Sequence, residues 1–178
     1  VNSSIGRAFR FNAGYLDPDW WSARIWLGTS DNKFDINDLG FIRRNNITWG
    51  GARLAFRKQE PWGRFINNNI EFKYTQNWNR SGLILERQFE VEQNNLFSNY
   101  WRFGFFGNLF LPGFNDEDVF RNHNAWVYKT ELWGYGGPSI STDRRKKIII
   151  GAEFGSGYGK NRGRGYRANI WLQVKPIE

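Results

Sequence analysis

The residues of this sequence that could do chemistry are carboxylates and cations placed at every second position of several segments. Glu86, Glu90 and Glu92 alternate with apolar residues in this way. Two carboxylates held at a fixed separation can hydrolyse a glycosidic bond, so a glycan hydrolase using Glu86 and Glu90 is one interpretation. Cations alternate among the same carboxylates, which favours cross-strand ion pairs over catalysis. We therefore predict no catalytic residue and a luminal ion-pair lattice made of Arg53, Glu71, Lys73, Glu86, Glu90 and Arg102.

Other chemical motifs are weak. The sequence has no H-E-x-x-H or G-x-S-x-G motif and no cysteine, and its one histidine, His123, lies in a polar stretch without obvious partners. The segment "GSGYGKNRGRG" resembles a phosphate-binding loop only loosely, because the residues after it alternate like a strand and do not begin a helix. We expect no enzyme activity and no cofactor.

Two charged segments could bind ions or lipids. Asp116 and Asp118, in "NDED", are weak calcium ligands without the spacing of a known site, so solvated loop charge is favoured and no metal is predicted. The basic residues predicted to form a surface patch are Arg144, Arg145, Lys146, Lys147, Arg162 and Arg164. Since the aromatic residues belong mainly to alternating segments, lipid phosphates explain this patch better than nucleic acid does. We expect no nucleic-acid partner.

The elements that must position these residues are long strands, because apolar and polar residues alternate along most of the chain. In one segment Ile70, Phe72 and Tyr74 share a face, and Glu71 and Lys73 share the other. One polar face per strand excludes a parallel sheet and predicts an antiparallel meander of about nine strands. The predicted strands span 5–16, 20–29, 46–58, 64–78, 82–94, 99–111, 125–136, 146–157 and 166–175.

Composition favours a membrane barrel over a soluble one. Aromatic residues make up 19% of the 178 residues, with 10 Trp, and many, Trp133 and Tyr135 among them, fall near strand ends, where a membrane barrel carries its interfacial girdles. The predicted strands exceed the usual length in soluble sheets, and the net charge of +8 suits an anionic neighbour. The residues predicted to face lipid are Ile70, Phe72, Phe103, Phe105 and Leu109. Alternation alone leaves open a soluble barrel that binds an apolar ligand.

Connection lengths predict orientation and register. Long connections alternate with short ones, as external loops alternate with periplasmic turns, and "NRS" is the exception. An odd strand number predicts that residues 1–178 are part of a larger barrel. The opening "VNSSIG", which has neither Met nor a signal sequence, predicts a processed chain or a segment of a longer one. A two-residue turn at Asn79 and Arg80 predicts Lys73 opposite Glu86, and a turn centred on Leu96 predicts Glu90 opposite Arg102.

Three segments carry a resemblance to a known family: "NAGYLDPDWW", "DINDLGFIRRNN" and "GGPSISTDRRKK". They resemble the barrel region of an outer-membrane family of unknown function from Bacteroidota that usually carries an N-terminal carbohydrate-binding family 9-like domain. The residue types of the family pattern D-x-N-P-x-x-G-F-x-R recur in order at Asp35, Asn37, Gly40, Phe41 and Arg43, with Asp38 in place of the proline and one residue fewer before the glycine. The resemblance implies an outer-membrane barrel attached to a glycan-binding domain, and it supplies no catalytic residues.

The expected function is therefore a segment of a transmembrane β-barrel in a bacterial outer membrane, serving as scaffold, anchor or conduit linked to glycan binding or uptake. The expected partners are outer-membrane lipid, lipopolysaccharide, glycan and other envelope proteins. Three alternatives stay open: an accessory subunit of a larger envelope complex, a soluble ligand-binding barrel, and the glycan hydrolase.

Overall fold

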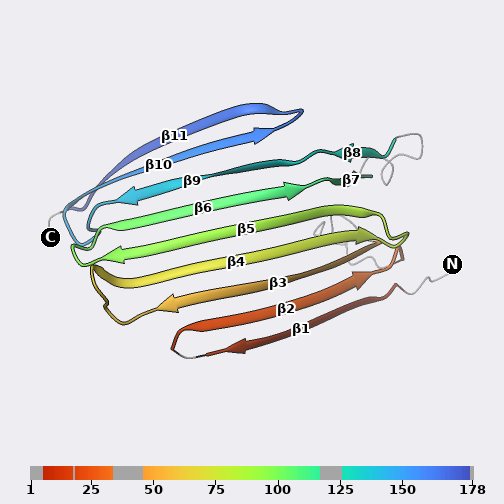
Figure 1. The fold of residues 1–178 in the computed structure, drawn as a ribbon, viewed down its shortest axis with the longest axis horizontal. Helices are drawn as coiled ribbons and strands as arrows, with labels where there is room; N and C mark the ends of the chain where they lie inside the picture. The colour runs from red at the N-terminus through yellow and green to blue at the C-terminus, as the bar shows by residue number, and fades with distance from the viewer. Residues whose placement is uncertain (1–5, 18, 34–45, 117–125, 177–178) are drawn as a thin grey trace.

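The computed structural model describes residues 6–17, 19–33, 46–116 and 126–176, which form an all-β structure (Figure 1). Its strands are β1 (Ala8–Leu16), β2 (Trp21–Ser30), β3 (Ile47–Lys58), β4 (Phe65–Asn79), β5 (Ile84–Phe97), β6 (Arg102–Leu111), β7 (Gly113–Asn115), β8 (Tyr128–Thr130), β9 (Trp133–Ser141), β10 (Ile148–Gly159) and β11 (Gly163–Val174). Among these residues no helix has the length and apolar character needed to cross a membrane.

Nine of these strands form one antiparallel sheet in the order β1-β2-β3-β4-β5-β6-β9-β10-β11, and β7 pairs with β8 separately. Each strand of this sheet pairs with the next strand along the chain, except that β6 pairs with β9, because β7 and β8 lie between them in the sequence and form their own small sheet. The prediction of an all-β antiparallel meander of about nine strands is confirmed. The predicted strand 125–136 differs, because its described part divides between β8 and β9 and β9 continues to Ser141.

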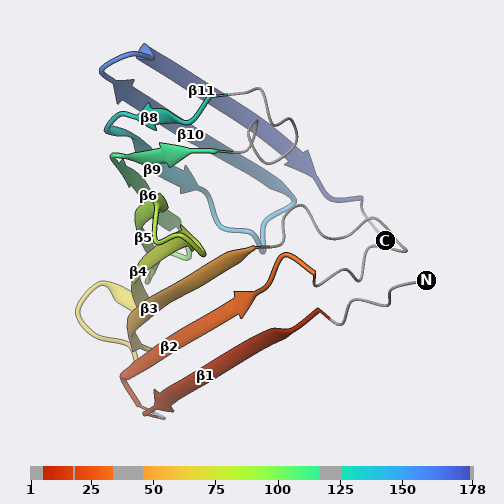
Figure 2. The same cartoon turned by 90° about the vertical axis from the view of Figure 1, so that its right-hand side faces the viewer.

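The sheet is curved, and its two faces differ in chemistry. Seen from the end with the long connections, the strands form a C-shaped wall that opens to the right (Figure 2). Side chains converge on a concave face and spread apart on a convex one. On the central strands β4 and β5 the side chains of Glu71, Lys73 and Glu90 are 21%, 36% and 31% exposed, whereas Phe72 and Phe89 are 45% and 48% exposed. Arg53, on β3, is 45% exposed. The polar residues therefore occupy the concave face and the apolar residues the convex face.

The handedness of L-residues gives the same assignment. In Figure 1 β5 points to the left, and the N–H of Phe97 bonds to the carbonyl of Trp101 in the turn leading to β6, the strand above it, at 2.9 Å. For an L-residue in this orientation, the side chain of Phe97 points towards the viewer. Phe89 and Val91 lie an even number of residues before Phe97 on β5, so their side chains point towards the viewer as well. The near side of Figure 1 becomes the left, convex side of Figure 2.

The sheet has almost no apolar core of its own. Among the described residues the buried apolar side chains are Ala55, 3% exposed, and Ile149, 1% exposed. Helices and strands usually bury their apolar face against a second layer, which is missing over the described part of this sheet. Among the described residues the apolar side chains of the convex face are therefore left exposed.

The connections differ at the two ends of the sheet. The turns 17–20, 59–64, 98–101 and 142–147 join strands at one end, which lies at the left of Figure 1. The strand ends that flank residues 31–46 and 112–132 lie at the other end, with the short turns 80–83 and 160–162. We name these the short-turn end and the long-connection end.

The predicted register of both hairpins is wrong. Lys73 lies opposite Glu90, four residues beyond the predicted Glu86. The turn loops over three residues and ends at Gly82, whose φ of 83° is the left-handed conformation that glycine favours, and a bulge between β4 and β5 adds one further residue. In the next hairpin Glu90 lies opposite Asn108, six residues beyond the predicted Arg102. The second turn lies at Ser98–Tyr100, with Tyr100 in the left-handed region at φ 62°, and not at Leu96.

Candidate functional site

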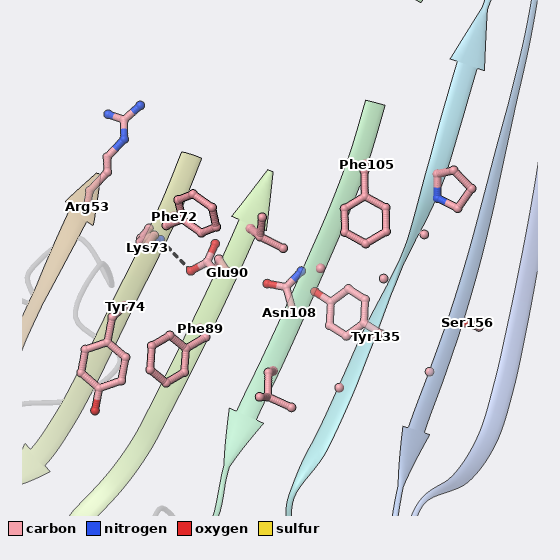
Figure 3. Close-up of a pocket in the computed structure, with 18 of the residues that line it drawn as sticks. Arg53, Phe72, Lys73, Tyr74, Phe89, Glu90, Phe105, Asn108, Tyr135 and Ser156 are labelled. Carbon is pink, nitrogen blue, oxygen red and sulfur yellow. Dashed lines mark hydrogen bonds and ion pairs between the residues drawn. The ribbon is translucent and has the colours of Figure 1, made fainter. Parts of the chain in front are cut away.

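Polar side chains bond across neighbouring strands on the concave face. Lys73 donates from Nζ to Glu90 Oε1 at 2.8 Å, which joins β4 to β5 (Figure 3). Arg53 bonds Glu71 at 2.5 Å between β3 and β4, and Gln88 donates to Asn108 at 2.8 Å between β5 and β6. These bonds follow one level of the sheet and bind its central strands together through side chains.

The structure brings together four of the six predicted lattice residues: Arg53, Glu71, Lys73 and Glu90. Glu86 lies opposite Asn77 towards the long-connection end, and Arg102 lies opposite Leu96 and Ser141 near the short-turn end. The observed registers differ from the predicted ones by four and six residues. Because both numbers are even, Glu86 and Arg102 stay on the concave face, but they lie at other positions along the strands.

Like charges also face each other in this lattice. Arg24 lies directly opposite Arg53, and Glu71 lies directly opposite Glu92. Such pairs oppose pairing, so stability alone does not account for the placement. The concave face instead carries arginines on β2 and β3 and carboxylates on β5, with Glu71 and Lys73 of β4 between them.

The geometry does not suit glycoside hydrolysis by Glu86 and Glu90. Four residues of a strand separate their backbone positions by about 13 Å, whereas the two carboxyl groups of glycosidases lie about 5 to 9.5 Å apart. Glu90 also holds Lys73. Glu86 and Glu90 are therefore too far apart along β5 to act as a glycosidase pair.

The five residues predicted to face lipid all lie on the convex face. Ile70 and Phe72 share the face of Phe89, and Phe103, Phe105 and Leu109 continue it on β6. A groove of about 1080 Å³ crosses this face, where Gly107, Gly134 and Gly136 leave a hollow between larger side chains. Figure 3 shows the rings of Phe72, Phe89 and Phe105 along it.

Aromatic rings gather at the short-turn end. Trp20 stacks on Phe56 with ring centroids 5.9 Å apart, and Trp62 stacks on Phe65 at 5.2 Å. Phe65 in turn contacts Phe97 at 5.0 Å. These rings form a belt along the end of the sheet, which is the position expected of an interfacial girdle.

Trp133 and Tyr135 do not belong to a girdle on the apolar face, contrary to the sequence interpretation. They lie on the concave face, where Trp133 stacks on Phe110 with centroids 4.1 Å apart and an interplanar angle of 4°. Tyr135 lies opposite Asn108 and Gly157, which are concave-face residues. In the sequence Trp133 and Tyr135 alternate with Gly134 and Gly136, and glycine marks a face as neither polar nor apolar. The sequence therefore did not show on which face the two rings lie.

Sequence reasoning also missed a set of tryptophan–glycine pairs on the concave face. A Cβ added to Gly51 would lie 2.3 Å from the ring of Trp26, its cross-strand partner. Gly28 is covered in the same way by Trp49, and Gly151 by Trp171. Each indole lies flat over a bare stretch of backbone, an arrangement known as aromatic rescue. The signal was present in the sequence, since these tryptophans alternate in step with polar residues.

The predicted basic patch is not one surface. Arg144 to Lys147 lie in the β9–β10 turn at the short-turn end, whereas Arg162 and Arg164 lie at the β10–β11 turn at the long-connection end. β10, which separates them, has 12 residues and spans about 40 Å. The two groups therefore act at opposite ends of the sheet.

Within the first group, Arg145 joins two turns. It donates to Asp143 Oδ2 from Nη2 at 2.8 Å, and its Cζ lies 3.0 Å from the ring centroid of Tyr100 in the β5–β6 turn. The hydrogen bond from Arg145 lowers the pKa of Asp143 from its ordinary 3.8 to about 2, and the same bond raises the pKa of Arg145. Arg145 is thus engaged within the protein.

This contact predicts a pH dependence at the short-turn end. A carboxyl group with a lowered pKa in the folded state adds stability that is fully present above the unfolded pKa of 3.8 and is lost as the pH falls through about 2. We expect the amide proton of Arg145, which bonds Asp143 at 2.9 Å, to keep its protection at pH 4 and above and to lose it between about pH 4 and pH 2. Hydrogen exchange measured by NMR checks this. Asp143→Asn should abolish the dependence, and an unchanged profile in that variant would contradict the assignment.

The calcium candidates receive no support as a site. Asp116 is buried and accepts a hydrogen bond from Asn79 Nδ2 at 3.0 Å, while Asp118 and His123 lie outside the described residues. Across the part of the chain that the structure describes, no three His, Cys, Asp or Glu side chains gather as metal ligands.

These features define a class of protein: an all-β chain whose nine-stranded curved sheet has a polar concave face and an exposed apolar convex face. The chain belongs to the family described as Domain of unknown function (DUF5916), whose model matches residues 3–177. No curated protein and no solved structure matches it. Catalysis has no support from this family, and the Bacteroidota origin and the carbohydrate-binding domain implied by the resemblance stay predictions.

Proposed function

We propose that this chain is a wall segment of a transmembrane β-barrel in a bacterial outer membrane, with its convex face against lipid. One observation carries the proposal: apolar side chains stay exposed on the convex face of all nine strands while only Ala55 and Ile149 are buried among the described residues. Monomeric soluble proteins rarely expose apolar patches beyond a few hundred Å². Hydrocarbon covers such a face without a second protein layer.

The curvature supports lipid over a soluble barrel. A soluble ligand-binding barrel keeps its apolar side chains inside, on the concave face. Here Arg53, Glu71, Lys73 and Glu90 occupy the concave face. A polar interior with an apolar exterior is the arrangement of barrels in the outer membrane.

Strand lengths and aromatic residues support the same placement. β3 to β6 have 10 to 15 residues, enough to cross a bilayer at a tilt of about 45°, which needs about 9 to 11. The belt of Trp20, Phe56, Trp62 and Phe65 would lie at one interface.

The sheet supplies part of the barrel wall. Within the described residues β1 and β11 are the edges of the sheet, and both run in the same direction (Figure 1). Joining them directly would require a parallel pair in an otherwise antiparallel wall. Further antiparallel strands close the barrel, which then serves as scaffold, anchor or conduit for glycan binding or uptake. Lipopolysaccharide and outer-membrane lipid are its surroundings, and other envelope proteins are potential partners.

The orientation of the barrel gives a direct test. Since the chain contains no cysteine, Arg80→Cys reports on the long-connection end and Lys146→Cys on the short-turn end. A membrane-impermeant maleimide should label Arg80→Cys in intact cells at least tenfold faster than Lys146→Cys, because long connections are external. Permeabilising the outer membrane should equalise the two rates and serves as the control. Equal labelling of both variants in intact cells would overturn the proposed orientation.

A further inference from the structure

The β10–β11 hairpin has a concentration of glycine that the barrel wall alone does not require. The positions of four glycines are ones whose side chains would face the concave side: Gly155, Gly157, Gly159 and Gly165. Glycine inside a strand costs roughly 0.5 to 1 kcal/mol relative to alanine. Bare backbone on one face of a hairpin admits another group at close range.

Part of this glycine surface is occupied by the protein itself. A Cβ at Gly159 would lie 2.8 Å from the Cβ of Trp133, and a Cβ at Gly157 would lie 3.1 Å from that of Tyr135. A Cβ at Gly165 would meet nothing within 4 Å, so this part is open. The remaining space is a cleft of about 450 Å³, which we name the hairpin cleft.

The hairpin cleft has an aromatic wall. Phe106, Trp133 and Tyr135 line it from β6 and β9. Tyr135 lies 5.5 Å from Trp133 and 6.3 Å from Phe106, between ring centroids. Phe110 stacks on Trp133, and Cζ of Arg162, which also lines the cleft, lies 4.5 Å from the Trp133 ring centroid. Trp133 is therefore held between its neighbours, and Tyr135 is the exposed ring of the three.

Charged groups line the other parts of the cleft. Glu153 and Arg167 lie near one another across β10 and β11, because Glu153 pairs with Asn169 and Gly155 pairs with Arg167. Neither side chain makes a hydrogen bond or ion pair with another residue that the structure describes. One offers an acceptor and the other a donor to a ligand.

We propose that the hairpin cleft binds a pyranose ring of a carbohydrate, an inference that rests on the concave face being a wet barrel interior. A sugar ring presents C–H groups on its face, which pack on aromatic rings, and hydroxyl groups on its edge, which exchange hydrogen bonds with Glu153 and Arg167. The glycine floor lets the flat ring approach the backbone. A few placed polar groups in a largely aromatic cleft are the usual composition of a small-molecule site.

The test is saturation-transfer NMR on the full chain in detergent micelles, with cellohexaose and oligogalacturonate as neutral and acidic probes. We expect transfer to the ring C–H protons of at least one probe, and binding weakened at least tenfold by Tyr135→Ala and by Gly165→Val, which fills the open floor. Phe154→Ala is the matched control, since Phe154 lies on β10, the strand between those of Tyr135 and Gly165, but on the convex face and outside the cleft lining, and it should bind like the unaltered chain. Circular dichroism confirms that each variant is folded.

Two results would overturn the site: no transfer to either probe, or unchanged binding in both folded cleft variants. Tighter binding of oligogalacturonate would indicate that Arg167 binds a uronate carboxylate. Equal binding of the two probes would indicate that the cleft recognises the neutral parts of the pyranose ring. The cysteine-labelling experiment reports on the barrel separately. Correct labelling without sugar binding refutes the cleft alone, and sugar binding with wrong labelling refutes the orientation alone.

Discussion

Phe105→Arg should destabilise the membrane-inserted barrel by about 2 to 4 kcal/mol, the cost of an arginine on the lipid face at the middle of a bilayer. Phe105 is 40% exposed on the convex face, near the middle of the level occupied by Phe72 and Phe89. No carboxylate lies opposite it, because its cross-strand partners are Gln93 and Pro138. Denaturant unfolding from phospholipid vesicles measures the change.

Asn108→Arg is the matched control on the same strand. Asn108 lies on the concave face directly opposite Glu90, so an arginine there gains a carboxylate neighbour while losing the hydrogen bond with Gln88. We expect a change of less than about 1 kcal/mol. Equal destabilisation by both arginines would contradict the assignment of the two faces.

Gly137→Ala should be the most damaging small substitution, with a loss of about 3 kcal/mol or more. A Cβ at this buried position would lie 1.8 Å from the carbonyl oxygen of Phe154 and 3.0 Å from the Cα of Gly155. Both groups are backbone, so the strands β9 and β10 must separate, and overpacking of this kind costs about 1 to 3 kcal/mol even where side chains can move. Thermal or denaturant unfolding gives the magnitude.

Gly165→Ala separates this clash from the general effect of replacing a strand glycine. The added Cβ meets nothing within 4 Å, and Gly165 does not need a positive φ. Alanine there should be neutral or stabilise by up to about 1 kcal/mol. If Gly137→Ala were as mild as Gly165→Ala, the close approach of β9 to β10 would be wrong.

The strands could be predicted from the sequence because alternation is a local property. Segments such as Ile70 to Tyr74 record their two faces directly, whatever their neighbours are. Register is a property of the turns. The position of Gly82 in the left-handed region and the bulge near Leu85 moved Lys73 from Glu86 to Glu90, and only the first of these has a visible signal, the glycine itself.

The hairpin cleft could not be predicted because it depends on three strand pairings at once. Phe106, Trp133 and the glycines of β10 are far apart in the sequence, and their approach follows from the registers of β6 with β9 and of β9 with β10. The long insertion between β6 and β9 hides that pairing. Trp133 therefore resembled a girdle residue at a strand end until its partner Phe110 was known.

The central claim is that lipid covers the convex face, and a nitroxide scan of β6 tests it most directly. Single cysteines from Arg102 to Leu111, spin-labelled in phospholipid vesicles, report their access to oxygen, which concentrates in hydrocarbon, and to a water-soluble nickel chelate. The account predicts a period of two, with oxygen access highest at Phe103, Phe105 and Leu109 and nickel access highest at Arg102, Phe106 and Asn108. Nickel access at Phe105 as high as at Asn108, or no alternation along the strand, would contradict it.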